Sequence, residues 1–585
     1  MHQPETSANS LDDTNGNRWT QSGSAAHATR FSCVSFTIRL QCEPELGWCQ
    51  GGKFGKIRGL GLGLREILPS AHYWLMALSR TRSAAVYGIE AHFIDVEVDM
   101  YPSGAQRDFI TVGMPDTAVR ESRERIKSAL ANSGFSYPAK SVTINLAPAN
   151  VRKEGAGFDL PMALGILGAM GVVALPEDAL FVGELSLDGR LRPVRGTLSI
   201  AVAAQKEGLR CLIVPADNGA EAATAGGVKV YAMEHLTQVA QFLRQPEMFQ
   251  PVERVTPQDI PDEASSLDFG DVRGQTTAKR ALEVAAAGGH NVLMIGPPGS
   301  GKTMLAKRFP GILPPFTFQE AVETTQIHSV AGALPRGAGL LSRRPFRSPH
   351  HTVSDAGFIG GGMGIPRPGE VSLAHNGVLF LDELPEFQRN VLEMLRQPLE
   401  DRQVTLARSM MTLCFPASFV LLAAMNPCPC GFFGDTTREC RCTGAIIQRY
   451  LGKLSGPLLD RIDVHMEVPA VPYQELRTKR KEVDPCGTTI MMRERVCAAR
   501  ERQNTRGFYN AHIPSSEIGK LCELDAAGER TLELAMRKLG LSARAHDRIL
   551  KVGRTIADLD HADNISAKHL AEAVQYRSLD RNYWQ

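Results

Sequence analysis

The sequence predicts an α/β protein of several domains, followed by a helical C-terminal segment. Apolar runs of strand length alternate with helical segments over residues 84–247 and again over 269–470, which is typical of α/β domains. From 471 to 585 the apolar residues recur at a spacing of three to four, as on the buried face of a helix. At 585 residues, the chain is also too long to fold around a single core.

The composition is that of a folded protein. Hydrophobic residues make up 43% of the chain and charged residues 22%, which excludes a mainly disordered or fibrous protein. The formal net charge is only +2, so contacts with nucleic acid would have to come from local patches. Aromatic residues, at 6%, are too few to favour a binder that stacks bases on exposed rings.

The first 75 residues differ from the rest. They are rich in Ser, Thr, Asn, Gln and Gly, and we expect a disordered leader, or a chain that truly starts at Met76, rather than a regulatory or targeting arm. No signal peptide is recognisable, and the longest apolar run, Leu160–Leu175, is shorter than a membrane span and predicts a buried helix. A cytoplasmic protein without membrane contact is therefore expected, with its cysteines reduced.

The first α/β domain is predicted from short, clear patterns. Residues 92–99 alternate like a half-buried strand, and further strands are expected over 142–146, 181–185 and 211–215. Helices are expected after Asp116, which would cap the first of them, after Asp159, and near residues 200–207. A polar, Pro-containing linker over 248–268 ends this domain.

The second domain opens with a glycine-rich loop between an apolar strand, 291–295, and a helix that includes Met304. In such a loop the backbone N–H groups bind a β-phosphate, Lys302 reaches the β- and γ-phosphate oxygens, and Thr303 binds Mg²⁺. A nucleoside triphosphate is therefore predicted to bind here. The loop reads Gly296, Pro297, Pro298, Gly299, Ser300, Gly301, Lys302, Thr303.

Two further apolar strands end in polar residues. The strand 377–381 runs into Asp382, placed to hold Mg²⁺, and Glu383, placed to polarise the attacking water. This acidic pair favours ATP hydrolysis over a GTPase switch. The strand 419–425 ends at Asn426, which could bond the γ-phosphate or the water, or could be an ordinary turn residue before Pro427.

These strands in this order resemble an AAA+ ATPase. Four segments, residues 346–352, 368–377, 424–431 and 455–463, look more closely like the ComM/YifB family of magnesium-chelatase-like AAA+ proteins. The resemblance runs from about Met76 to the C-terminus. It implies ATP and Mg²⁺ as cofactors, a homo-oligomeric ring, most simply a hexamer, and a C-terminal helical lid of the magnesium-chelatase type.

The resemblance also assigns catalytic roles to particular arginines. Arg461 matches the finger that reaches the γ-phosphate of a neighbouring subunit, and Arg544 matches the second sensor arginine of the helical lid, with Arg548 as a helper. An arginine so placed would neutralise charge in the transition state. Without the resemblance, each would be an ordinary charge on a solvated helix.

A basic hairpin is expected around Ala407-Arg408-Ser409, between two β-prone runs. It resembles the pore hairpin of minichromosome-maintenance helicases, which makes Arg408 a candidate DNA contact, with a plain solvated turn as the alternative. The segment with Arg347 is a second candidate DNA surface. Its neighbours His350 and His351 are poor candidates for metal ligands, because consecutive side chains diverge.

The N-terminal domain resembles the Lon protease domain, which needs a Ser–Lys dyad. The corresponding stretches, residues 154–157 and 194–198, place neither Ser nor Lys at the required positions. Without a hydroxyl nucleophile and an amine base there is no acyl transfer. We therefore expect a scaffold or a DNA-binding module without protease activity.

Four cysteines follow the third strand closely, in the pattern C-x-C-x₉-C-x-C within an insert over 428–442. Four thiolates could hold a structural Zn²⁺. Reduced free thiols, a disulfide and an iron–sulfur site are the alternatives. The cysteines are Cys428, Cys430, Cys440 and Cys442.

The resemblance implies an ATP-driven, ring-forming motor that moves branched or single-stranded DNA, with branch migration during natural transformation as its task. An ATPase that remodels a protein partner, as magnesium chelatase does, is the main alternative. A Lon-like ATP-dependent protease is a weaker one, because the dyad is missing.

Overall fold

The computed structural model describes residues 78–102, 108–254, 267–362, 364–408, 411–435, 438–471 and 487–579. The expectations for residues 1–75 and for a start at Met76, and most of the linker predicted over 248–268, lie outside these residues. Over the described ranges, no helix is both long enough and apolar enough to cross a bilayer.

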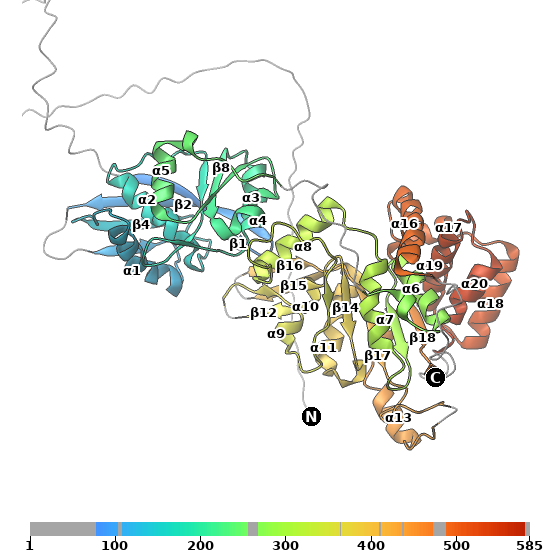
Figure 1. Ribbon diagram of the computed structural model, residues 1–585. Coiled ribbons are helices and arrows are strands. Elements are labelled where there is room, and N and C mark those ends of the chain that lie inside the picture. Colours follow the sequence, from blue (N-terminus) through green and yellow to red (C-terminus); the bar gives the residue numbers. More distant parts are fainter. Residues whose placement is uncertain are drawn as a thin grey trace, which may run out of the picture. The chain divides into compact units, whose positions relative to one another are not determined.

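The N-terminal region, residues 78–254, is built on one mixed sheet with strand order β3-β4-β2-β1-β5-β8-β9 (Figure 1). The pairs β1–β2 and β2–β4 are antiparallel, and the other neighbours are parallel. The strands are β1 (Ser79–Tyr87), β2 (Glu90–Tyr101), β3 (Phe109–Val112), β4 (Ser141–Ala147), β5 (Ala179–Phe181), β8 (Cys211–Pro215) and β9 (Lys229–Met233), with a small ladder of β6 (Glu184–Leu185) and β7 (Leu191–Arg192).

Helices of this region pack beside the sheet, and local sequence signals explain where two of them begin or end. The predicted cap is confirmed, because Asp116 accepts a hydrogen bond of 2.8 Å from the Val119 N–H. The prediction of one helix over Leu160–Leu175 is wrong in length: α2 ends at Ala169, and Gly171 takes a left-handed φ of 72°. The helices are α1 (Thr117–Asn132), α2 (Asp159–Ala169), α3 (Thr197–Lys206), α4 (Gly219–Ala223) and α5 (Leu236–Arg244).

The second region is built on a parallel sheet with strand order β11-β14-β17-β10-β18. Every residue of β10, β14 and β17 is buried, as expected for strands covered on both faces, and this explains their unbroken apolar runs. The strands are β10 (Val292–Ile295), β11 (Phe346–Arg347), β14 (Val378–Leu381), β17 (Val420–Met425) and β18 (Val464–Glu467).

Short helices connect these strands, and two small ladders extend from them. The predicted basic hairpin is confirmed, because β15 (Gln403–Arg408) pairs antiparallel with β16 (Met411–Pro416). The second ladder joins β12 (Gly360–Gly361) to β13 (Arg367–Pro368). The helices are α6 (Thr276–Gly288), α7 (Lys302–Arg308), α8 (Phe318–Ala331), α9 (Asp355–Phe358), α10 (Glu370–Leu373), α11 (Arg389–Met394), α12 (Arg396–Asp401), α13 (Gly444–Leu451) and α14 (Gly456–Leu459).

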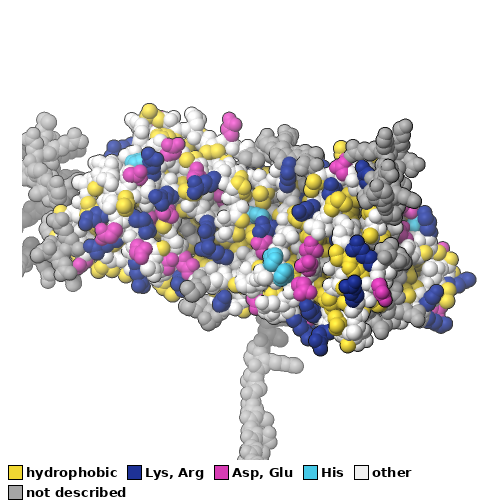
Figure 2. Space-filling model, turned by 60° about the horizontal axis from the view of Figure 1, so that its bottom comes forward, with side chains coloured by type: hydrophobic (Ala, Val, Ile, Leu, Met, Phe, Trp, Pro, Cys, Tyr) yellow, Lys and Arg dark blue, Asp and Glu magenta, His cyan; other side chains and the backbone are white. Residues whose placement is uncertain are grey.

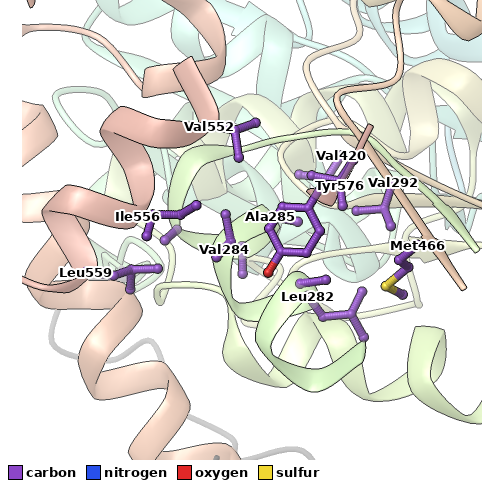
Figure 3. Close-up of a cluster of buried hydrophobic side chains, with 14 of the residues drawn as sticks. Leu282, Val284, Ala285, Val292, Val420, Met466, Val552, Ile556, Leu559 and Tyr576 are labelled. Carbon is purple, nitrogen blue, oxygen red and sulfur yellow. The ribbon is translucent and has the colours of Figure 1, made fainter. Parts of the chain in front are cut away.

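The described C-terminal residues, 487–579, form helices that pack on the parallel-sheet region. Helices α16 and α19 contact α6, and Figure 3 shows Val552 and Ile556 of α19 and the Tyr576 ring gathered with Val284 and Ala285 of α6. One hydrophobic core therefore joins the two. The helices are α16 (Thr489–Arg506), α17 (Ser515–Leu521), α18 (Ala526–Leu539), α19 (Ala543–Leu559) and α20 (Ala567–Gln575).

A buried carboxylate fixes these helices to one another. Asp558 of α19 is fully buried and accepts hydrogen bonds from Arg506 at 3.0 Å, from Arg554 at 3.1 Å and from Asn510 at 2.7 Å. Both guanidinium groups lose water on burial, so they depend on this one negative charge.

We predict that Asp558→Asn lowers the free energy of unfolding by about 3–5 kcal/mol, because it leaves Arg554 buried without its counter-charge. The matched control is Asp563→Asn, whose carboxylate is 93% exposed and pairs with Arg502 at 2.6 Å, and it should cost at most about 1 kcal/mol. Urea denaturation followed by circular dichroism measures both, and equal losses would contradict this role for Asp558.

Candidate nucleotide site

The glycine-rich loop follows the carboxyl end of β10 and leads into α7. Two of its glycines are required by geometry. A Cβ on Gly296 would overlap the Val468 carbonyl oxygen, and Gly301, immediately before the helix, has a φ of 92° that side chains rarely adopt. The loop thus directs its backbone N–H groups and the amino end of α7 to one point, where a phosphate can bind.

Lys302 is the cation of this loop. It is 8% exposed, and its Nζ donates to the carbonyl oxygens of Gly296 at 2.7 Å and Pro297 at 2.9 Å. Burial lowers the pKa of Lys302 from its ordinary value, and the nearby carboxylates of Asp382 and Glu383 oppose that shift. The ammonium group is therefore held inside the loop, as binding to β- and γ-phosphate oxygens requires.

Asp382 and Glu383 directly follow the last residue of β14 and lie beside α7. The Thr303 hydroxyl donates to Asp382 Oδ2 at 2.7 Å, so both predicted magnesium ligands lie side by side. Glu383 is exposed and has a left-handed φ of 53°, which is uncommon for a residue with a side chain. Strain of this kind persists where a side chain has to be directed to a particular place.

Asn426 follows β17 directly. Its Oδ1 accepts a hydrogen bond of 3.2 Å from Lys302 Nζ, and the Gly296 N–H donates to the Met425 carbonyl oxygen at 3.2 Å. The sheet order places β17 between β10 and β14, so the loop, the acidic pair and the amide converge at one edge.

The residues at this edge fit ATP with Mg²⁺. A hydroxyl and a carboxylate 2.7 Å apart are hard oxygen ligands of the kind that Mg²⁺ binds. Bound Mg²⁺ would neutralise charge on the β- and γ-phosphates. Lys302 would hold the same oxygens, Glu383 would orient and polarise the attacking water, and Asn426 would bond the water or the γ-phosphate.

Arg461 lies at the opposite edge of the sheet. It precedes β18, and Asn291, which precedes β10, donates to the Arg461 carbonyl oxygen at 3.1 Å. The four residues of β10, roughly 13 Å long, therefore separate it from the phosphate loop of its own chain. Its side chain is 9% exposed and pairs with Glu400.

Arg544 and Arg548 lie near the same edge. Arg544, in the first turn of α19, is 67% exposed and lies 3.7 Å from Asp460. Arg548 pairs with Asp463, which also contacts His290 at 3.3 Å. Burial alone would raise the pKa of Asp463, but Arg548 and His290 hold it well below its ordinary value. Arg548 therefore has a structural partner, whereas Arg544 is open to solvent.

The two candidate DNA contacts differ in their surroundings. Arg408 is exposed at the end of β15, and the only polar contact of its side chain within the described residues is a weak one of 3.5 Å to the Gly362 carbonyl oxygen. Arg347 instead forms a two-pronged ion pair with Glu370, at 2.6 Å for each hydrogen bond. Its charge is already compensated, which leaves Arg408 as the better candidate for a phosphate contact.

The histidine pair belongs to no group of three or more possible metal ligands among the described residues. His350 and His351 lie with their ring centroids 4.1 Å apart, and His350 Nδ1 bonds the Thr352 hydroxyl at 2.9 Å. The four cysteines do come together, with their sulfur atoms all within 4.8 Å of one another. The N–H groups of Phe432 and Arg441 donate to Cys430 and lower the pKa of its thiol to about 6.

The two protease-like stretches of the N-terminal region hold no hydroxyl–amine pair. Residues 154–157 form a turn and a short 3₁₀ helix, and Thr197 is buried at the start of α3. The neighbouring Lys153 is fully buried, and its Nζ donates to the Pro148 carbonyl oxygen. Burial lowers the pKa of Lys153.

Sequence reasoning missed the acidic partners of the arginines, namely Glu400, Asp460 and Glu370. Each lies on a different element from its arginine, and only the folded chain shows the pairing. For Glu370 and Asp460 a signal existed, since they belong to the segments 368–377 and 455–463 that carried the family resemblance. For Glu400, no local pattern identifies the partner.

We predict that Lys302→Ala abolishes nucleotide binding, because it removes the buried cation of the loop. Glu383→Gln should keep nucleotide affinity and lower ATP turnover about 10²–10⁴-fold, since only activation of the water is lost. Fluorescent-nucleotide titration and phosphate release measure the two effects. Glu386→Gln is the control, because this exposed carboxylate pairs with Lys453 at 3.3 Å; turnover by Glu383→Gln equal to that of this control would refute the assignment.

Comparison with known families assigns three parts of the chain. The family described as magnesium chelatase, subunit ChlI, matches residues 268–476. A second model of that subunit matches 96–218, and a model of its C-terminal part matches 487–577. The three matches lie in the N-terminal α/β region, in the region of the candidate nucleotide site and in the C-terminal helices, respectively.

Individual proteins match over most of the chain. The YifB protein of Escherichia coli is 46% identical over 509 residues, which cover 86% of this chain and 98% of YifB. The competence protein ComM of Haemophilus influenzae is 44% identical, again over 86% of this chain and 98% of its own. Lon protease 2 of Bacillus subtilis is 31% identical over 151 residues, 24% of this chain and 26% of that protease. The chain therefore belongs to the ComM/YifB family of magnesium-chelatase-like AAA+ ATPases.

Proposed function

We propose that this protein is an ATP-driven ring that moves DNA, and that it migrates branches of recombination intermediates during natural transformation. The observation that carries the proposal is the separation of the catalytic groups between two edges of one sheet. The phosphate loop, the acidic pair and Asn426 lie at the carboxyl edge, whereas Arg461 lies at the amino edge.

The separation favours a ring. Arg461 cannot reach the phosphates of its own chain across the length of β10, but the amino edge of one subunit can meet the carboxyl edge of the next. A head-to-tail contact of this kind closes into a ring when the rotation permits. By family resemblance, a hexamer is the simplest assembly. In it, Arg461 would be released from its ion pair with Glu400, and both Arg461 and Arg544 would face the nucleotide of the neighbouring subunit.

DNA as the substrate is supported by the hairpin of β15 and β16. Arg408 ends β15 beside the turn, exposed and with no ion pair to any described residue. Figure 2 shows Lys and Arg side chains scattered among Asp and Glu over the face in view, rather than gathered in one basic patch. Affinity for DNA would then depend on a few cations repeated around a ring, such as Arg408.

Remodelling of a protein partner is the second candidate, and the magnesium chelatase match over residues 268–476 favours it. The two functions share the same ATPase and differ in what stimulates it. DNA should stimulate turnover only if the DNA motor is correct. Proteolysis has no support, because the likeness to Lon protease 2 covers only 24% of this chain and the dyad is missing.

We predict that Arg461→Ala lowers ATP turnover by at least about 10³-fold, as the loss of an arginine finger does. Mixing Arg461→Ala subunits with Lys302→Ala subunits should restore part of the activity, since some interfaces then join an intact phosphate loop to an intact Arg461. Phosphate release measured across mixing ratios tests this.

The control mixture combines Lys302→Ala with Glu383→Gln subunits. Both changes damage the same edge, so no interface is complete and no recovery is expected. Absence of recovery in the Arg461 mixture at every ratio would contradict action across subunits.

We predict that Arg408→Ala weakens DNA binding to a similar extent for different sequences and lowers the salt dependence by about one charge per engaged subunit. ATP turnover without DNA should be unchanged, because Arg408 lies away from the nucleotide site. Fluorescence anisotropy over a salt series measures the effect. Arg537→Ala, an exposed arginine of α18, is the control; equal DNA affinity in both variants would remove the hairpin from the proposal.

A further inference from the structure

The four cysteines form a closed group of sulfur atoms with the dimensions of a metal site. The Cys428 sulfur lies 3.3 Å from that of Cys430 and 3.7 Å from that of Cys440, and the last two are 3.6 Å apart. Four sulfurs around Zn²⁺ at about 2.3 Å would be separated by about 3.8 Å at the edges of a tetrahedron. All four are free thiols, and the group is too compact to enclose the inorganic sulfides of an iron–sulfur cluster.

The segment that carries these thiols, described at residues 428–435 and 438–442, is here called the cysteine loop. It begins two residues after Asn426 and returns to the fold just before α13, which starts at Gly444. Cys428 is fully buried in the hydrophobic core that includes residues of β14, β17 and α13, and the other three cysteines pack against it. The cysteine pairs therefore lie where the loop leaves the sheet and where it returns.

The cysteine loop also touches the phosphate loop. A Cβ on Gly431 would overlap the ring of Pro298, so the glycine backbone packs directly against this proline ring. Gly431 lies next to Cys430 and donates its N–H to the Cys428 carbonyl oxygen at 3.0 Å. Two residues before the cysteine loop begins, Asn426 accepts a hydrogen bond from Lys302, so this part of the chain contacts the phosphate loop both within the cysteine loop and just before it.

We infer that Cys428, Cys430, Cys440 and Cys442 bind Zn²⁺, and that the bound ion fixes the phosphate loop in the form that binds nucleotide. A four-thiolate site closes the loop and orders Gly431 against Pro298, because metal binding to a site of this kind is coupled to local folding. The coupling rests on the proposed function in one respect, namely that the phosphate loop binds ATP.

The experiment uses the full-length protein. Elemental analysis of the purified protein should find about one zinc per chain. Removal of zinc with 1,10-phenanthroline should weaken the binding of fluorescent ADP about tenfold, as expected if the competent form of the loop falls to roughly a tenth of the population. Addition of Zn²⁺ should restore the affinity. ADP is measured without Mg²⁺, so that the chelator acts on zinc alone.

Variants distinguish zinc binding from its effect on ADP affinity. Cys440→Ser should lose zinc and ADP affinity together, whereas Gly431→Ala should keep zinc and lose affinity, because Gly431 is not a ligand. Cys414→Ser, which changes an exposed cysteine of β16 outside the cluster, is the control and should keep both. Should Cys440→Ser fail to fold, the reversible removal of zinc from the native protein decides the question.

Two results would overturn the inference: purified protein without zinc, or zinc-free protein with unchanged affinity for ADP. Neither measurement involves DNA. If zinc and ADP binding are coupled but DNA does not stimulate turnover, the DNA motor fails and the zinc site stands. If DNA stimulates turnover but zinc removal leaves ADP affinity unchanged, the zinc inference fails and the DNA motor stands.

Discussion

The parallel pairing of β10 with β17 on one side and β18 on the other is the constraint on which the site depends. It aligns the carboxyl ends of the strands, so that the phosphate loop, Asn426 and, through β14, the acidic pair meet at one edge. There Lys302 bonds Asn426 and Thr303 bonds Asp382. These strands are buried on both faces, which explains their unbroken apolar runs. The same pairing places Arg461 at the other edge.

In the proposed ring, a site divided in this way would tie catalysis to assembly. Each chain carries the phosphate loop at one edge of the sheet and Arg461 at the other. The C-terminal helices would take part through Arg544 of α19, a helix joined to α6 by a shared core and to α16 by the buried Asp558 cluster. A shift of these helices would move Arg544 relative to the sheet, which would couple subunit contacts to the state of the nucleotide.

The sequence predicted the parts whose signals are local. The phosphate loop, the strand ending at Asp382, the hairpin at Arg408 and the cap at Asp116 are each contained in a few consecutive residues. The helix predicted over Leu160–Leu175 was too long because hydrophobicity continues after Ala169, although Gly171 ends the helical backbone. Pairings such as Arg461 with Glu400, and the contact of Gly431 with Pro298, depend on distant segments that only the fold brings together.

Branch migration on a synthetic four-way DNA junction tests the central claim most directly. With ATP, the wild-type protein should convert the junction into duplex products, and the same junction should accelerate ATP turnover. Without ATP, or with the Glu383→Gln protein, the junction should persist. A protein that hydrolyses ATP at the same rate with and without the junction, and leaves the junction intact, would contradict a DNA motor.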